Sequence, residues 1–234
     1  TIGLELQHVQ DATLTDVENF FYKYYRPNNA ILTISGGISA DNALQLAKKW
    51  FGDIPSGEPF NRNIAMEPEQ QAAKFQHVKK DVPVNVIYKA WKMPGRIEPL
   101  YYATNLLSDV LGLGESSRLQ HALKKETKLF TDIAAYITGS IDTGMFIITG
   151  KLAEGITYEQ AEQGIQQELD KIKQAPITDA ELTSVKNTVE MLESADLVNT
   201  EIHRYLNVDA ASIHTIAQQL LTAEKCSTLY YGKD

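Results

Sequence analysis

The sequence has almost no cysteine: Cys226 is the one cysteine among 234 residues. An internal disulfide and a zinc cluster of several cysteines are therefore excluded. Cys226 begins a predicted C-terminal strand, so we interpret it as a small buried hydrophobe rather than as a nucleophile.

Long apolar runs and an excess of positive charge are also absent. No segment approaches the roughly 20 apolar residues that a membrane-spanning helix needs, and no signal sequence opens the chain. The formal net charge of −8 argues against nucleic-acid binding, which needs a basic patch. We expect no membrane span and no nucleic-acid partner. Because the chain opens at Thr1 without a methionine, we expect a soluble fragment, and the sequence assigns no compartment.

A metal-binding pattern is the third absence. None of the five histidines has another histidine three or four residues away, the spacing that places two ligands on one helical face. His121 and Glu126 come nearest to a ligand pair, but we expect a spacing of five to turn them off a common helical face. Gly112-x-Gly114 also lacks the further glycine and the lysine of phosphate-binding loops. We therefore expect no metal, no cofactor and no catalytic residue in this chain. The histidines are His8, His77, His121, His203 and His214.

The segment from Leu106 to Lys151 carries the densest structural signals. Its first part predicts a helix that ends where Gly112 and Gly114 permit a positive φ. Ser116 then stands where it can cap a second helix. That helix should bury Leu119, and it should turn Arg118 and the charged residues 124–126 toward water. The segment ends with two antiparallel strands, at 133–138 and 145–150, which the turn at 139–144 connects.

Capping boxes and alternating apolar residues predict the other elements. Helices should begin after Thr13, Ser39, Thr157 and Thr178, another helix should have Pro99 in its first turn, and a last helix should cover 212–221. Further strands are predicted at 30–35, 75–78, 84–91 and 226–231. Residues 56–73 contain several structure-breaking residues and little periodicity, so we interpret them as a linker.

An internal repeat relates the two ends of the chain. At a shift of 196 positions, six residues of the first helix–strand unit coincide with similar residues of the last one. The spacing within the helix, the length of the connection and the final glycine agree without a gap. The sequence therefore predicts a duplicated fold, of which the first copy is present only as its closing segment. The pairs are Val17/Ile213, Phe20/Ile216, Tyr24/Leu220, Tyr25/Leu221, Ile34/Tyr230 and Gly36/Gly232.

Two stretches resemble the pitrilysin/insulinase-like zinc metallopeptidases. The first runs from Ile2-Gly3 to Gly36 and includes Tyr24-Tyr25-Arg-Pro-Asn-Asn-Ala-Ile-Leu32. The second contains Gly112-Leu-Gly-Glu-Ser-Ser-Arg-Leu119. The resemblance implies an α+β fold with an antiparallel-rich sheet covered on one face by helices. It also implies that 1–55 closes a catalytic-type domain and that 74–234 is a complete non-catalytic second domain.

The resemblance carries expectations about chemistry and partners as well. The parent would be a zinc endopeptidase that acts on peptides or proteins, and this chain would form part of its chamber wall. Its partners would be the missing catalytic domain and possibly a second family subunit. Some family members also use an arginine and, seven residues later, a tyrosine to hold the substrate; Lys124 and Thr131 stand at those places and keep neither chemistry. The substrate-contact candidates are Gly112, Gly114, Ser116, Lys124 and Thr131.

Two other functions fit the same residues. The family includes core proteins of a respiratory complex that have lost catalysis, so the chain is also compatible with a structural assembly subunit. An independent protein-binding module is the third hypothesis. An upstream His-x-x-Glu-His motif would indicate the enzyme, its loss would indicate the scaffold, and a separate function for 74–234 alone would indicate the module.

Overall fold

The computed structural model describes residues 5–59, 64–192 and 201–233, with the side chains of 189–192 left out. Ile2 and Gly3 of the first family-like stretch thus lie outside the described residues. The chain divides into two compact units, Thr1–Glu67 and Pro68–Asp234. The division falls within residues 56–73, where the sequence predicts a linker, and the domain assignment itself stays a prediction.

The first unit contains three α-helices and a single 3₁₀ turn among its described residues. The Thr13 side chain and Asp16 form the expected capping box at the start of α2, and the Ser39 side chain caps α3. The helices predicted after Thr13 and Ser39 are therefore confirmed. The elements are α1 (Leu6–Gln10), α2 (Leu14–Tyr24), η1 (Pro27–Asn29) and α3 (Ala40–Phe51).

The strand predicted at residues 30–35 is wrong for this chain. These residues are irregular, and Ile31 is 96% exposed. A strand needs a neighbour to satisfy its backbone N–H and C=O groups, and no strand occurs among the described residues of the first unit. None of those residues is buried either.

The second unit is built on one sheet of five strands in the order β1-β5-β2-β4-β3. Only β1 and β5 pair in parallel; the other three pairings are antiparallel. The predicted α+β class with an antiparallel-rich sheet is confirmed. The strands are β1 (Lys74–Lys79), β2 (Val86–Met93), β3 (Phe130–Thr138), β4 (Gly144–Leu152) and β5 (Ser227–Gly232).

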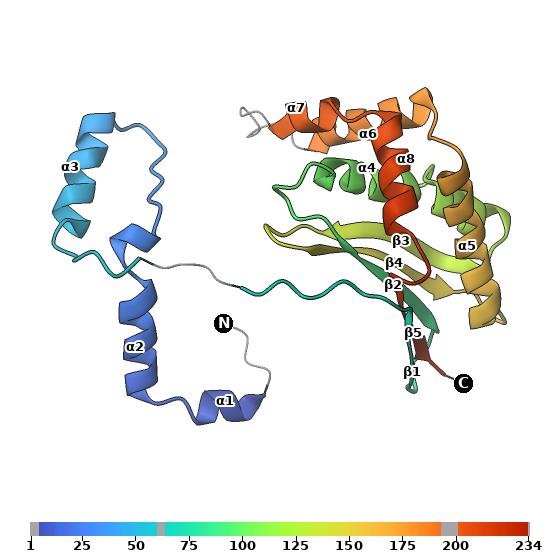
Figure 1. Ribbon diagram of the computed structural model, residues 1–234, viewed down its shortest axis with the longest axis horizontal. Coiled ribbons are helices and arrows are strands. Elements are labelled where there is room, and N and C mark those ends of the chain that lie inside the picture. The colour runs from blue at the N-terminus through green and yellow to red at the C-terminus, as the bar shows by residue number, and fades with distance from the viewer. Residues whose placement is uncertain (1–4, 60–63, 193–200, 234) are drawn as a thin grey trace. The chain divides into compact units, whose positions relative to one another are not determined.

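The helices of the second unit gather on one face of this sheet (Figure 1). Helix α5 begins with the predicted capping box of Thr157 and Gln160. Thr178 and Glu181 form the corresponding reciprocal hydrogen bonds at the start of α6. The helices are α4 (Tyr101–Gly112), the π-helix η2 (Gln120–Glu126), α5 (Tyr158–Gln174), α6 (Asp179–Leu192), α7 (Glu201–Leu206) and α8 (Ala210–Leu220).

The hydrophobic core lies between the sheet and these helices. Alternate residues of β2, including Ile87 and Trp91, are buried beneath the helices together with Phe146 of β4. Leu106 and Leu111 of α4 are fully buried above them. The opposite face of the sheet is far more open: Tyr88, Tyr136 and Met145 are 37%, 43% and 46% exposed. The sheet thus has one apolar, covered face and one half-exposed face.

Candidate functional site

The turn after α4 brings together the glycines that the sequence singles out. Gly112, the last residue of α4, is buried against β3: a Cβ there would lie 1.9 Å from the backbone N of Ala135. A side chain at this position would push the helix off the strand. Gly114 has a φ of +77°, and nothing lies near the place of its missing Cβ. The first glycine therefore serves close packing, and the second serves the turn.

The second helix of this segment starts one residue later than the sequence predicts. Ser116 is exposed, and it is the carbonyl of Ser117 that accepts the first helical hydrogen bond, from the His121 N–H at 2.9 Å. The Ser117 hydroxyl donates to the carbonyl of Gly114 at 2.7 Å. The capping role expected for Ser116 is wrong, because the hydroxyl next to it closes the turn instead.

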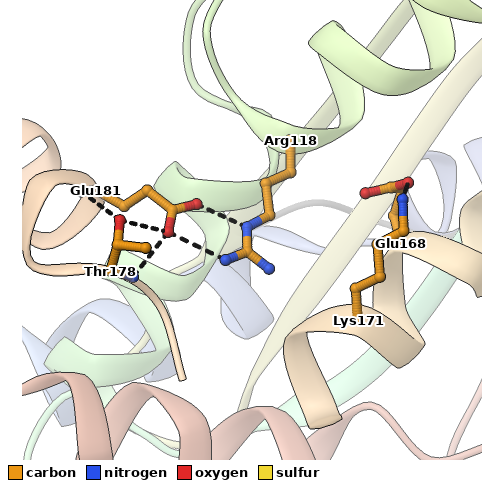
Figure 2. Close-up of polar contacts among 5 residues, drawn as sticks. All are labelled: Arg118, Glu168, Lys171, Thr178 and Glu181. Carbon is orange, nitrogen blue, oxygen red and sulfur yellow. Dashed lines mark hydrogen bonds and ion pairs between the residues drawn. The ribbon is translucent and has the colours of Figure 1, made fainter. Parts of the chain in front are cut away.

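Arg118 is tied to α6 rather than directed toward water, which corrects the expectation from the sequence. Its Nε lies 2.7 Å from Oε1 of Glu181, and its second terminal nitrogen lies 3.1 Å from Oε2 (Figure 2). This two-point contact is the strong geometry for an arginine–carboxylate pair. Glu181 also accepts hydrogen bonds from the backbone and hydroxyl of Thr178.

Glu181 is the most strongly perturbed carboxyl in this region. The hydrogen bonds from Arg118 act against burial and, with those from Thr178, lower the pKa of Glu181 to about 2. Glu181 therefore caps α6 and also ties it to the start of the helix that follows the glycine turn. Figure 2 also shows the ion pair between buried Glu168 and exposed Lys171 of the nearby α5, 2.6 Å long.

The helix after the turn is a π-helix, which the sequence does not predict. The N–H of Thr127 donates to the carbonyl of Ala122, five residues earlier, at 3.0 Å. The wider turn brings His121 Nδ1 within 3.5 Å of Glu126 Oε1, so the expectation that a spacing of five separates them is wrong. Lys128 follows with a φ of +54°, an uncommon value for a residue other than glycine.

The last two substrate-contact candidates lie within this π-helix and in the strand β3 that follows it. Lys124 is half-buried, and its Nζ lies 3.3 Å from a carboxylate oxygen of Glu115. Hydrogen bonds from Lys125 and then from Lys124 lower the pKa of the exposed Glu115 carboxyl. Thr131 is exposed at a bulge in β3, and its hydroxyl donates to the carbonyl of Lys151. The structure thus places four of the five candidates at the surface or near it and Gly112 in the core. Their role as substrate contacts stays a prediction.

Comparison with known protein families shows to which family this chain belongs. A model of the family described as "Peptidase M16 inactive domain" matches residues 11–189, more than half of the chain. The chain belongs to the peptidase M16 family. The match covers the glycine turn, the π-helix and the β3–β4 hairpin, so the resemblance to pitrilysin-like peptidases is confirmed.

The M16 relatives include proteins named as zinc proteases. The zinc protease PqqE of Helicobacter pylori is 28% identical over 184 residues, which are 77% of this chain and 41% of that protein. The beta subunit of the mitochondrial-processing peptidase of Saccharomyces cerevisiae is 22% identical over 240 residues, 96% of this chain and 50% of that protein. The chain thus spans half or less of the length of these relatives.

Solved structures of other proteins share the fold. A protease from Helicobacter pylori superposes with a TM-score of 0.84 at 22% identity, covering 97% of this chain and 61% of that one. A chain of Complex III2 from Candida albicans superposes with a TM-score of 0.77 at 14% identity, covering 97% and 60%. At these identities the likeness shows the fold alone.

The described residues of this chain show no set of ligands for a zinc ion. In the part that the structure describes, no group of three or more histidine, cysteine, aspartate or glutamate side chains is placed to hold a metal. His121 with the carboxylate of Glu126 makes a pair, and a zinc site needs at least three protein ligands. No helix in the described ranges is long and apolar enough to cross a membrane.

Sequence reasoning missed two ion pairs that organise the M16 fold here. Besides Arg118 with Glu181, Lys89 of β2 is only 5% exposed and pairs with Glu162 of α5, which also accepts a hydrogen bond from the Tyr230 hydroxyl. Burial opposes the charge of Glu162, but the hydrogen bonds from Lys89 and Tyr230 hold its pKa below the usual value. Lys89 lies between Ile87 and Trp91 on the buried face of β2. This alternation in the sequence could have predicted a buried lysine that needs a charged partner.

Proposed function

We propose that this chain is the non-catalytic part of a zinc-dependent M16 endopeptidase and forms part of the wall of its substrate chamber. The observation that carries the proposal is the half-exposed face of the sheet in the second unit. Tyr88, Tyr136 and Met145 lie on that face, as the register of β2, β3 and β4 requires. Their side chains offer aromatic and flexible apolar surface to an unfolded peptide.

The chemistry for cleavage would come from outside these residues. The relatives named as zinc proteases support a zinc ion in the parent, and the described part of this chain offers no ligand set for one. A parent of this kind binds a peptide on one wall and cleaves it at another. The catalytic domain, and in some assemblies a second family subunit, would be the partners.

The test is peptide hydrolysis by the full-length protein, alone and with its partner subunit. We expect activity that a chelator removes, whereas the 234-residue chain should contain no stoichiometric zinc and cleave nothing. About one tightly held zinc per 234-residue chain would contradict the proposal. No hydrolysis by the full-length protein in either state would instead favour an assembly subunit, the alternative with which the Complex III2 fold is compatible.

The wall role has its own measurement in the active full-length protein. Tyr88→Ser and Tyr136→Ser should each raise KM about tenfold with kcat within twofold, because they remove binding surface that substrate and transition state share. Gln167→Ser, on the exposed side of α5, is the matched control and should change neither constant. If all three variants have the kcat and KM of the unmodified protein, the half-exposed face is excluded as a substrate surface.

A further inference from the structure

The half-exposed face of the sheet differs in charge from the chain as a whole. The register of the five strands places Lys74, Lys92 and Lys151 on this face, and Asp132 is the one acidic residue that these strands direct to it. The whole chain has 30 acidic residues and 22 lysines and arginines. Basic residues thus outnumber acidic ones on this face, although the reverse holds for the chain.

Protection of a sheet edge explains only one of these lysines. A lysine on an edge strand discourages pairing with another chain, and Lys74 lies on the edge strand β1. Lys151 lies on β4, which is an inner strand between β2 and β3, so that reason does not apply to it. Lys92 is also on an inner strand, and its Nζ donates to the carbonyl of Pro68 at 2.8 Å. The positive charge on the inner strands needs another explanation.

Lys74 and Lys151 are exposed and available to a ligand. Among the residues that the structure describes, neither side chain has a hydrogen bond or an ion pair. Asp132 lies opposite Lys151 in the pairing of β3 with β4, yet no ion pair joins them within that described part. Lys171 and Lys173 of α5, by contrast, each pair with a carboxylate.

The two exposed lysines flank the apolar centre of the face. Lys151 pairs with Val86 of β2, and Tyr88, two residues further along β2, pairs with Leu229 of β5. Lys74 lies beyond β5, so three strand spacings and four residues along a strand separate it from Lys151. That separation is about 20 Å, which an extended peptide spans in about six residues.

We propose that the half-exposed face selects peptides with two acidic side chains about six residues apart on either side of an apolar stretch. Lys151 and Lys74 bind the two carboxylates, and Tyr88 and Leu229 contact the residues between them. The inference rests on the proposed role of this face as a substrate surface and adds the class of substrate. A basic peptide would meet like charge at both lysines.

The test is fluorescence anisotropy of labelled peptides with the full-length protein, from which a chelator has removed metal so that no peptide is cleaved. The peptides share one sequence with a tyrosine and a leucine at its centre, and they carry glutamate, glutamine or lysine at two positions six residues apart. The glutamate peptide should bind about fivefold more tightly than the glutamine peptide, and the lysine peptide should bind most weakly. In about 0.5 M salt the three affinities should converge, because exposed charges are then screened.

Two variants and a matched control assign the charge preference to the face. Lys151→Gln and Lys74→Gln should each reduce the preference for the glutamate peptide to about twofold and leave the glutamine peptide unaffected. Gln167→Glu changes the net charge by the same amount on the exposed side of α5, and it should leave the preference unchanged. Tyr88→Ser should weaken the binding of all three peptides alike.

The outcomes separate this inference from the proposed function. Equal binding of the glutamate and glutamine peptides, or a preference that neither lysine variant reduces, would overturn the inference alone. No effect of Tyr88→Ser on any peptide would overturn the wall role together with the inference. A preference that depends on both lysines, without hydrolysis by the metal-loaded protein, would support the inference and remove the peptidase role. Loss of peptide binding as the protein dimerises would overturn the inference by assigning the face to a second copy.

Discussion

Helix α2 near the start of this chain and helix α8 near its end have nearly the same local structure, but α2 is exposed whereas α8 is packed into a core. Helix α2 and helix α8 share their lengths, their caps and the turns that follow them. Yet the strand forms only in the second unit, where β5 has neighbours on both sides. Local sequence is thus sufficient for a capped helix and a turn, whereas a strand exists only when other strands satisfy its backbone.

The comparison also shows where the stability of the chain resides. The second unit buries a continuous core, including residues of α8 that are fully enclosed. None of the described residues of the first unit is buried. Most of its apolar surface therefore contributes nothing to the stability of the folded chain until another surface covers it. Matched substitutions in the two copies can measure this difference directly.

The largest expected effect comes from a charge placed at the matched positions 213 and 17. Ile213→Asp should destabilise the second unit by more than about 4 kcal/mol, because it puts an unpaired charge into a fully buried site. Val17→Asp should change the same unfolding transition by less than about 0.5 kcal/mol, since Val17 is exposed. Urea unfolding followed by circular dichroism measures both. Similar losses for the two variants would show that the first unit is covered in the isolated chain.

A smaller effect on stability is expected from the capping boxes of α2 and α6. The box of α6 includes an ion pair, between Glu181 and Arg118, that the box of α2 lacks among the described residues. Among the described residues the Asp16 carboxylate accepts hydrogen bonds from Thr13, whereas the Glu181 carboxylate accepts them from both Thr178 and Arg118. The lowered pKa of Glu181, about 2, means that its contribution is complete above about pH 4.5 and is lost as the pH falls toward 2. Solvent reaches about a third of this side chain, which reduces the contribution to about 1–2 kcal/mol.

Unfolding curves between pH 6 and 2 test the capping-box comparison. Glu181→Gln should flatten the acid-induced loss of stability of the second unit relative to the unmodified chain. Asp16→Asn should leave that loss unchanged. If Glu181→Gln follows the same pH dependence as the unmodified chain, the ion pair with Arg118 makes no net contribution.

The sequence predicts those parts of the fold that depend on near neighbours along the chain. Capping boxes place the starts of α2, α5 and α6, and alternation places the strands of the second unit. The wrong strand at 30–35 has the right composition for a strand and lacks only partners. That information is not local, so periodicity alone cannot supply it.

The candidate region could be located from the sequence but not drawn in detail. The glycines mark the turn, yet the burial of Gly112 depends on Ala135 of β3, and the pairing of Arg118 depends on a residue 63 positions later. The π-helix changes the spacing rule that separates His121 from Glu126. In the first two cases a contact between distant segments overrides the local pattern, and in the third the helix itself departs from the α-helical geometry that the spacing rule assumes.

The helix caps themselves should give an effect of about 1 kcal/mol. Asp209→Ala removes the side chain that accepts from the Ser212 N–H at 2.8 Å and should destabilise the second unit by about that amount. Thr13→Ala removes the matched acceptor of α2 and should lower helix content without moving the unfolding midpoint of the second unit. Urea unfolding and far-ultraviolet circular dichroism separate the two outcomes. A midpoint shift for Thr13→Ala would mean that the two units unfold together.

The smallest effect is expected at Lys124 and Thr131, two residues of the second unit whose polar contacts are with the exposed Glu115 and Lys151. Lys124 pairs with the exposed Glu115, and Thr131 donates one long hydrogen bond at a bulge. Exposed pairs of this kind contribute little to stability, and neither side chain has the reach or the geometry of an arginine or a tyrosine. In the active full-length assembly, Lys124→Ala and Thr131→Ala should therefore lower kcat by less than about tenfold, whereas loss of one donor to a developing oxyanion typically costs on the order of 10²–10³.

Steady-state peptide hydrolysis checks this, with Gln167→Ser as the control. A loss of 10² or more at either position would assign the substrate-orienting role to this domain itself and remove the need for a second subunit to supply it.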